Sequence, residues 1–171
     1  LLMVQVARLR GVGLVIYCED DEHRLQIGKG LGADAILDTR KDAVAGEVFR
    51  LTGGWGCDLV VDHGQTEAIE LGSRLLRKQG RFVVGAAYAS TAAPKIEFGA
   101  ICNQKELTFI GRTMSGGVEA NAFALAIEYV RRGEIRLDRI VTHNLPLREF
   151  RRALEIAEHR LEHAIKVSMT P

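Results

Sequence analysis

The sequence predicts an α/β protein of three layers, in which helices cover both faces of a doubly wound, mostly parallel sheet. Two observations support this class. Helical and extended patterns alternate along the first half of the chain, and the extended segments contain the nearly continuous hydrophobic runs LVIYC, AIL, LVV and FVVGAA. Runs without polar alternation indicate strands that are buried on both faces, as in a parallel sheet covered by helices.

Glycines bound the elements of the first half. Leu2, Val6 and Leu9 have helical spacing, and Gly11 and Gly13 end that pattern before a β-branched run. Glycines also follow the next two helical patterns, as is common just after a helix C-terminus. We therefore expect helices at residues 1–10, 22–31, 41–52 and 66–78, alternating with strands at residues 14–19, 33–38, 57–62 and 80–87.

The alternation of helical and extended patterns is less regular in the second half of the chain. Residues 90–94 are small and include a proline, which predicts a connection. Gly116 and Gly117 could suggest a phosphate nest, but no lysine follows at P-loop spacing, so a flexible turn is expected. The expected helices here are 98–104, 120–132 and 147–160, and the expected strands are 106–111, 140–142 and 164–169.

Composition narrows the class of protein. With 171 residues and 47% hydrophobic content, the chain can bury one substantial core. Its 23 basic and 22 acidic residues leave a net charge of +1, which gives no electrostatic footprint for nucleic acid or an anionic membrane. No apolar stretch approaches a bilayer span and no secretory cleavage site is present, so a cytoplasmic location is expected. The three cysteines are far apart and predict neither a disulfide framework nor a cysteine zinc site.

One strand ends in a carboxylate. In the stretch GLVIYCEDDEHR the apolar run stops at Glu19, and two more acids follow. In doubly wound sheets an acid at the carboxyl end of the second strand accepts hydrogen bonds from the ribose hydroxyls of NAD and repels the 2′-phosphate of NADP. The alternative is that Glu19 only marks where the strand reaches the surface. Asp20, Asp21 and Glu22 are explained by a helix N-terminus, where negative charge complements the helix dipole.

Seven segments in order carry a family resemblance: VQVARLRGVG, HRLQIGKGLGAD, LTGGWGCDLVVD, KQGRFVVGA, KELTFIGR, RIVTHNLPL and HAIKVSMTP. Together they resemble the cofactor-binding and C-terminal part of the zinc-type medium-chain alcohol and polyol dehydrogenases, with the greatest similarity to the sorbitol and threonine dehydrogenase branches. The resemblance implies a Rossmann-like nucleotide-binding domain at residues 1–145. It also implies that the helix and strand at residues 146–171 pack, in the family, on a separate catalytic domain.

The resemblance also implies site residues. Glu19 falls at the family's ribose-binding acid, which is usually aspartate, and Arg24 falls near the adenine edge, although an ordinary exposed helix residue is the alternative for Arg24. The remaining matches are a loop under the cofactor and backbone positions near the nicotinamide end, where glycine lets a ligand approach closely. These residues are His63, Gly64, Gly85, Ala86, Gly111 and Arg112.

Other family features are expected to be missing from this chain. The first strand and its GxGxxG turn would stand immediately before Leu1, and that turn holds the cofactor pyrophosphate. The zinc ligands and the catalytic groups belong to the family's other domain, so we expect no catalytic or metal-binding residue here. His159 and His163 have a spacing that can bind zinc on a helix, but a solvated helix end is the preferred interpretation.

The missing central strand would leave a slot of about 10 Å between the strands at 14–19 and 57–62. Either those strands pair directly, or another segment fills the slot: the strand at 164–169 or a segment exchanged from a partner. The resemblance further implies a homodimer joined through the edge strand that begins at Glu106 and ends at Gly111.

Three functions therefore stay open. The chain is the nucleotide-binding portion of an NAD-dependent zinc-type alcohol or polyol dehydrogenase, not catalytic by itself. Alternatively it is a standalone dimeric scaffold with weak NAD affinity, or a partner-binding remnant with none.

Overall fold

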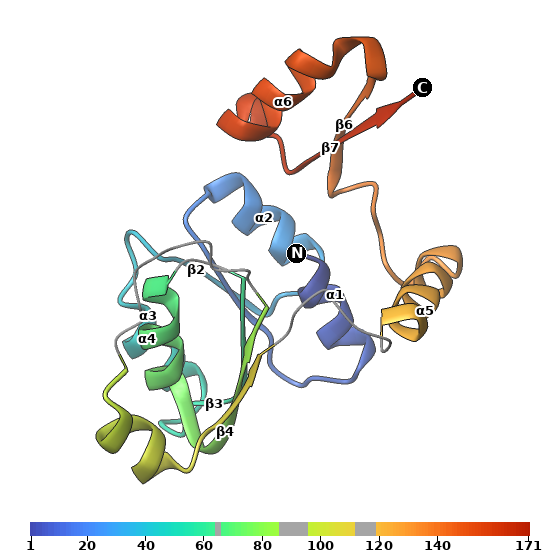
Figure 1. Ribbon diagram of the computed structural model, residues 1–171. Coiled ribbons are helices and arrows are strands. Elements are labelled where there is room, and N and C mark those ends of the chain that lie inside the picture. Colours follow the sequence, from blue (N-terminus) through green and yellow to red (C-terminus); the bar gives the residue numbers. More distant parts are fainter. Residues whose placement is uncertain (64–65, 86–95, 112–118) are drawn as a thin grey trace. The chain divides into compact units, whose positions relative to one another are not determined.

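The structure, a computed structural model, describes residues 1–63, 66–85, 96–111 and 119–171 (Figure 1). The chain divides into two compact units, each described here by itself. The first unit combines residues 1–41 with residues 120–171, and the second comprises residues 42–119.

The N-terminal part of the first unit is a helix–strand–helix–strand segment. Strands β1 and β2 pair in parallel, with Ile16 opposite Ala35 and Glu19 opposite Asp38. Helix α2 packs against both strands. The elements are α1 (Leu2–Leu9), β1 (Ile16–Glu19), α2 (Glu22–Gly30) and β2 (Ala35–Asp38).

The C-terminal part of the first unit contains a second parallel pair, β6 and β7, with α6 packed on it. Helix α6 ends at His159 because Arg160 adopts a left-handed backbone (φ 51°). Ile140 joins the buried cluster of α1, β1 and α2, and Ile165 packs against it, so the two parts of this unit share a core. The elements are α5 (Glu119–Arg131), β6 (Val141–Pro146), a 3₁₀ turn (Leu147–Glu149), α6 (Phe150–His159), a second 3₁₀ turn (Leu161–His163) and β7 (Lys166–Thr170).

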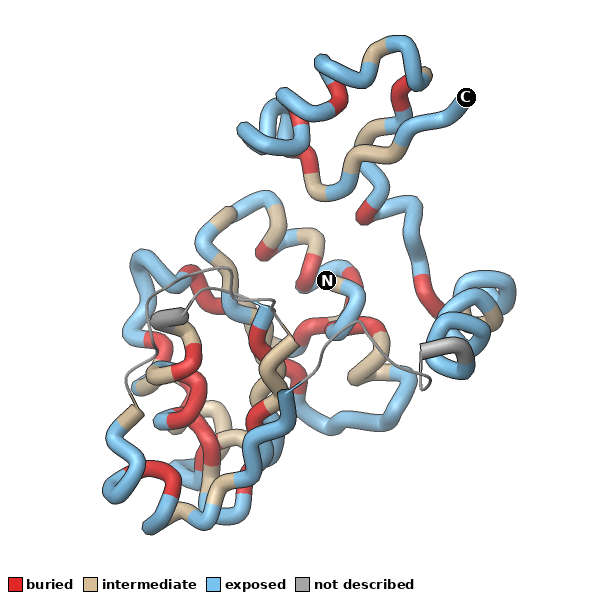
Figure 2. Tube along the Cα trace, in the orientation of Figure 1, coloured by how far each residue is buried: buried red, intermediate tan, exposed pale blue. Residues whose placement is uncertain are grey.

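The second unit is built on a three-stranded parallel sheet in the order β3-β4-β5. Helix α4 packs on β3 and β4, and buried residues gather along these elements (Figure 2). Phe82 of β4 is fully buried. Gly72 permits this close packing, since a Cβ there would come within 2.5 Å of the Phe82 ring. The elements are α3 (Val44–Leu51), β3 (Cys57–Asp62), α4 (Thr66–Leu75), β4 (Leu76–Val84), a π-helix (Phe98–Asn103) and β5 (Thr108–Gly111).

The predicted α/β class is confirmed, because all the strand pairs of the described residues are parallel and helices pack on them. Several boundaries differ: β6 continues to Pro146, beyond the strand expected at 140–142, and the expected start of β4 is wrong. β4 begins at Leu76, inside the helix expected at 66–78, because Leu76 is fully buried and pairs with Cys57. The connection at 90–94 and the turn at 115–117 lie outside the described residues. Within the described ranges, no helix is long and apolar enough to cross a membrane.

The prediction that the last strand fills the slot of the absent central strand is wrong. β7 pairs with β6, where Met169 lies opposite Leu145, and Val167 packs on the buried cluster beneath α6. The described strands form three sheets, with β1 and β3 in different ones rather than paired directly. Strand exchange with a partner stays a prediction, as does the division at residues 145 and 146.

Candidate functional site

The candidate site lies at the carboxyl edge of β1 and β2. The carboxyl ends of parallel strands meet at one edge of a sheet, and the register places Glu19 beside Asp38 there. The last backbone bond of this edge runs from the N–H of Thr39 to the carbonyl of Glu19, at 3.0 Å. After Glu19 the chain turns into α2, so its side chain stands at the boundary between sheet and solvent.

Both carboxylate oxygens of Glu19 accept hydrogen bonds. The Tyr17 hydroxyl donates to Oε2 at 3.0 Å, and the backbone N–H of Asp20 donates to Oε1 at 3.1 Å. The Glu19 side chain is only 18% exposed. It is therefore held in place and largely covered, rather than extended into bulk solvent.

Arg24 connects the Glu19 region to the C-terminal part of the same unit. Its Nη1 lies 4.0 Å from Oε2 of Glu19, and its Nη2 donates to the carbonyl oxygen of Ala164 at 3.3 Å. The Arg24 side chain is 20% exposed, so the alternative of an ordinary exposed helix residue is wrong. Asp21 caps this helix by accepting from the Arg24 N–H at 3.0 Å, and that bond lowers the pKa of the Asp21 carboxyl.

Asp38 is a second acid at this edge, and the sequence analysis did not single it out. Its carboxylate accepts from the backbone N–H of Arg40 at 2.9 Å, from the Arg40 guanidinium at 3.2 Å and from Nζ of Lys41 at 2.9 Å. Arg40 above all holds the pKa of the Asp38 carboxyl well below its ordinary value. The signal that could have found Asp38 is its position: like Glu19, it ends an apolar strand.

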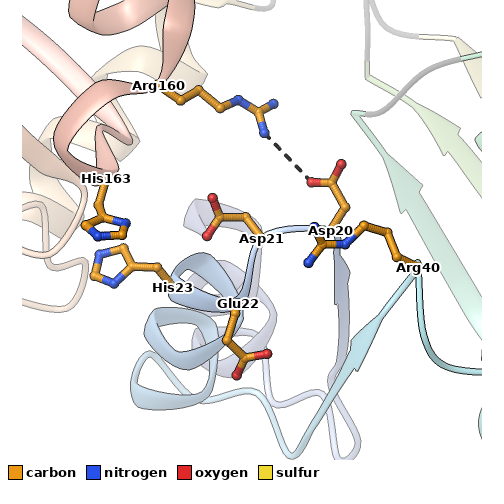
Figure 3. A pocket seen from close by; sticks show the side chains of 7 residues that line it. All are labelled: Asp20, Asp21, Glu22, His23, Arg40, Arg160 and His163. Carbon is orange, nitrogen blue, oxygen red and sulfur yellow. Dashed lines mark ion pairs between the residues drawn. The ribbon is translucent and has the colours of Figure 1, made fainter.

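An open depression of about 330 Å³ lies beside this edge (Figure 3). Asp20 and Arg160 form an ion pair of 3.7 Å across it, and the rings of His23 and His163 face each other with centroids 4.8 Å apart. Its lining residues are Asp20, Asp21, Glu22, His23, Arg40, Arg160 and His163.

The histidine pair considered for zinc does not share a helix face. α6 ends at His159, and His163 belongs to the following 3₁₀ turn, where its own φ is 59°. Among the residues that the structure describes, no three His, Cys, Asp or Glu side chains gather as a group able to hold a metal ion.

The remaining predicted residues belong to the second unit. His63, Gly85 and Gly111 stand at the carboxyl ends of β3, β4 and β5, which are neighbours in the sheet. The N–H of Gly85 donates to the carbonyl of Asp62 at 2.9 Å. A Cβ on Gly85 would come within 2.5 Å of the His63 ring, whereas Gly111 has open space around it. Gly64, Ala86 and Arg112 lie outside the described residues.

Comparisons with known proteins agree with this fold. Residues 1–131 match the model of the family described as "Zinc-binding dehydrogenase". D-arabitol-phosphate dehydrogenase of Enterococcus avium is 30% identical over 173 residues, which cover 100% of this chain and 48% of that protein. The chain thus spans about half the length of this curated relative.

Solved structures are similar as well. An alcohol dehydrogenase from Thermotoga maritima has a TM-score of 0.86 and 28% identity, and the match covers 98% of this chain and 46% of that one. A protein of E. coli CFT073 described as a short chain alcohol dehydrogenase, complexed with NADH, has a TM-score of 0.85 and 23% identity, with 99% and 48% covered. Since the family match spans most of the sequence and the fold agrees, this chain belongs to the zinc-binding, medium-chain dehydrogenase family.

Proposed function

We propose that this chain is the nucleotide-binding portion of an NAD-dependent, zinc-type alcohol or polyol dehydrogenase, and that Glu19 accepts hydrogen bonds from the adenosine ribose of NAD. The observation that carries this proposal is the position of the Glu19 carboxylate. It is largely covered, it lies at the carboxyl edge of a parallel strand pair, and its two recorded hydrogen bonds come from neutral donors. Ligands of open α/β sheets bind outside the carboxyl ends of the strands.

The chemistry of a ribose diol suits this carboxylate. The 2′ and 3′ hydroxyls are two donors on adjacent carbons, and an ionised carboxylate offers about four acceptor positions. Tyr17 and Asp20 occupy one position on each oxygen, which leaves others for the ligand. A 2′-phosphate would meet the negative charge of Glu19. We therefore expect a preference for NAD over NADP.

The other residues proposed for the cofactor have secondary roles. Arg24 stands 4.0 Å from Glu19 and supplies a positive charge beside the ribose position. His63, Gly85 and Gly111 end neighbouring strands of the second unit. Gly111 has open space around it, which leaves its backbone accessible to a ligand, whereas the His63 ring occupies the space beside Gly85. Gly64, Ala86 and Arg112 complete the proposed set from sequence alone.

Zinc in a dehydrogenase of this type acts as a Lewis acid on the alcohol oxygen. The described residues do not gather a suitable ligand set, so we assign zinc to no residue of this chain and propose no catalytic residue in it. Catalysis by this chain alone is not expected, and its cytoplasmic location stays a prediction.

One observation favours a second candidate function, that of a dimeric scaffold. β5 is an edge strand among the described strands, and all four of its residues are exposed. Phe109 and Ile110, both 37% exposed, place apolar surface on that edge. Unpaired edges of this kind favour association with another chain. We propose that two copies of this chain form a homodimer through β5, and this scaffold function does not require the chain to bind NAD.

Titration calorimetry of the 171-residue chain with NAD and with NADP tests the proposal. We expect Glu19→Ala to weaken NAD binding about tenfold, which is the effect of losing hydrogen bonds to a charged group. Glu19→Gln should also reduce the preference for NAD over NADP. Glu155→Gln, which replaces an exposed acid on α6, is the matched control.

Unchanged NAD affinity in Glu19→Ala would contradict the proposal, and a dimer without NAD affinity would favour the scaffold. An alcohol-dependent rise in NADH absorbance with added zinc would contradict the expected lack of catalysis.

A further inference from the structure

Tyr17 is placed to hold the Glu19 side chain. The two residues are two positions apart on β1, so their side chains lie on the same face of the strand. The Tyr17 hydroxyl donates to Oε2 of Glu19, while the Asp20 N–H donates to Oε1. Because the donors approach different oxygens, they fix the orientation of the carboxylate plane as well as its position.

The Tyr17 ring packs against Gly28, where the lack of a side chain leaves room for it. A Cβ at position 28 would come within 2.7 Å of Cε1 of the ring, and closer still to Cδ1. Gly28 is buried in the last turn of α2 and has no positive φ, so its backbone conformation does not require glycine. Glycine inside a helix is unfavourable relative to alanine. The ring of Tyr17 is thus the physical reason for glycine at this position.

We propose that Tyr17 is a positioning residue that fixes the Glu19 carboxylate for ribose hydroxyls, and that Gly28 serves this role by admitting the Tyr17 ring. The inference rests on the proposed function. A glutamate side chain has one more rotatable bond than an aspartate, so an unrestrained Glu19 would lose more conformational entropy when a ligand orders it. A hydrogen bond that is present before the ligand arrives reduces that loss and strengthens binding.

The phenol of Tyr17 remains a donor over the whole neutral range. Burial raises its pKa, and the neighbouring Glu19 charge raises it further. The Tyr17 hydroxyl therefore stays protonated and able to donate to Oε2 of Glu19 at neutral pH.

The test compares two nucleotides on the whole chain by titration calorimetry. AMP carries both ribose hydroxyls, and 2′,3′-dideoxyadenosine 5′-monophosphate carries neither. Tyr17→Phe keeps the ring and removes the hydroxyl, so AMP binding should weaken about three- to tenfold, the change that corresponds to about one net hydrogen bond. Binding of the dideoxy nucleotide should not change. Tyr129→Phe, which removes a phenol hydroxyl from α5, is the matched control.

A second pair of variants distinguishes a positioning role of Tyr17 from a general effect of the substitution on the fold. Glu19→Asp keeps the charge but shortens the arm, so the Tyr17 hydroxyl no longer reaches it. In that background Tyr17→Phe should have no effect on AMP affinity, which would show that the two residues act as a coupled pair. In the free protein Tyr17 should ionise above the ordinary pH range of a tyrosine, and Glu19→Gln should lower the pKa of Tyr17.

The outcomes distinguish the two proposals. If Glu19→Ala leaves AMP affinity unchanged, the proposed function fails and the positioning role fails with it. If Glu19→Ala weakens AMP binding but Tyr17→Phe does not, only the positioning role is overturned. It is also overturned if Tyr17→Phe weakens both nucleotides equally, since that result would report a structural defect.

Discussion

Replacing Gly28 with alanine sets helix propensity against the space occupied by Tyr17. Alanine in the middle of a helix is more favourable than glycine by about 1 kcal/mol. The added methyl group would lie within 2.7 Å of the Tyr17 ring, and overpacking of this kind typically costs about 1–3 kcal/mol. The ring cannot move aside freely, because its hydroxyl is bonded to Glu19 at 3.0 Å, and loss of that bond would add about 1 kcal/mol. We therefore expect Gly28→Ala to destabilise the first unit by about 1–3 kcal/mol.

The sign of this effect should reverse when the ring is removed. In a Tyr17→Ala background the same substitution has space, and helix propensity should then stabilise the protein by about 0.5–1 kcal/mol. Gly30 is a control on the same helix, because a Cβ there would meet nothing within 4 Å. Gly30→Ala should be neutral or stabilising in both backgrounds.

Hydrogen exchange of the α2 amides is the assay of choice. The chain has two compact units that need not unfold together, so a single denaturation midpoint would mix them. Protection of residues 22–30 reports the free energy of opening where the substitution acts. If Gly28→Ala raises protection equally with and without the Tyr17 ring, the ring does not limit the space at position 28, and the reasoning is refuted.

Three further predictions concern the same molecule. Arg24→Lys should keep the charge but lose the hydrogen bond to the Ala164 carbonyl, so hydrogen exchange at residues 164–170 should accelerate a few-fold. Unchanged exchange would show that this hydrogen bond does not stabilise the C-terminal strand. Asp21→Ala should destabilise α2 by about 1 kcal/mol at neutral pH through loss of its N-cap. The folded-state pKa of Asp21 is lowered, so its stabilising contribution is present above the ordinary value of 3.8 and is lost as the pH falls further. The difference in hydrogen-exchange protection of α2 between wild type and Asp21→Ala should therefore shrink in acid, and a constant difference would contradict the cap. Light scattering should give twice the 18.8 kDa chain mass, and Ile110→Lys on the β5 edge should reduce it to one chain; a wild-type monomer at high concentration would contradict the dimer.

The class of fold could be predicted because parallel strands covered by helices contain nearly continuous apolar runs, although the predicted burial on both faces is only partial: Cys18 of β1 and Leu59 of β3 are exposed. The run LVIYC has no polar alternation, and β1 ends at Glu19 as expected. The start of β4 could not be predicted in the same way. Leu75 and Leu76 fit the apolar side of a helix as well as a buried strand, and only the pairing of Leu76 with Cys57 decides between them.

Contacts between distant segments account for most of what the sequence did not reveal at the candidate site. One partner of the Arg24 guanidinium is a backbone carbonyl 140 residues away, at Ala164, and no local pattern specifies such a contact. The contact of Tyr17 with Glu19 could not be predicted for a different reason. Within an apolar strand a tyrosine is counted as hydrophobic, although its hydroxyl reaches the polar edge two residues further on.

The comparison of Glu19 with Asp38 shows why strand-end position alone does not identify a ligand-binding acid. Both carboxylates end apolar parallel strands and lie opposite each other in the register. Asp38 is bound by the cations of Arg40 and Lys41, which hold its pKa low and compensate its charge. Glu19 receives neutral donors from Tyr17 and Asp20, and its nearest recorded cation, Arg24, stands 4.0 Å away. A ribose hydroxyl is itself a neutral donor, so it can join the donors around Glu19, whereas at Asp38 it would have to displace cations that bind more strongly. The identity of the donors around each acid is therefore the reason why we propose Glu19, rather than Asp38, as the acid that accepts from a ribose.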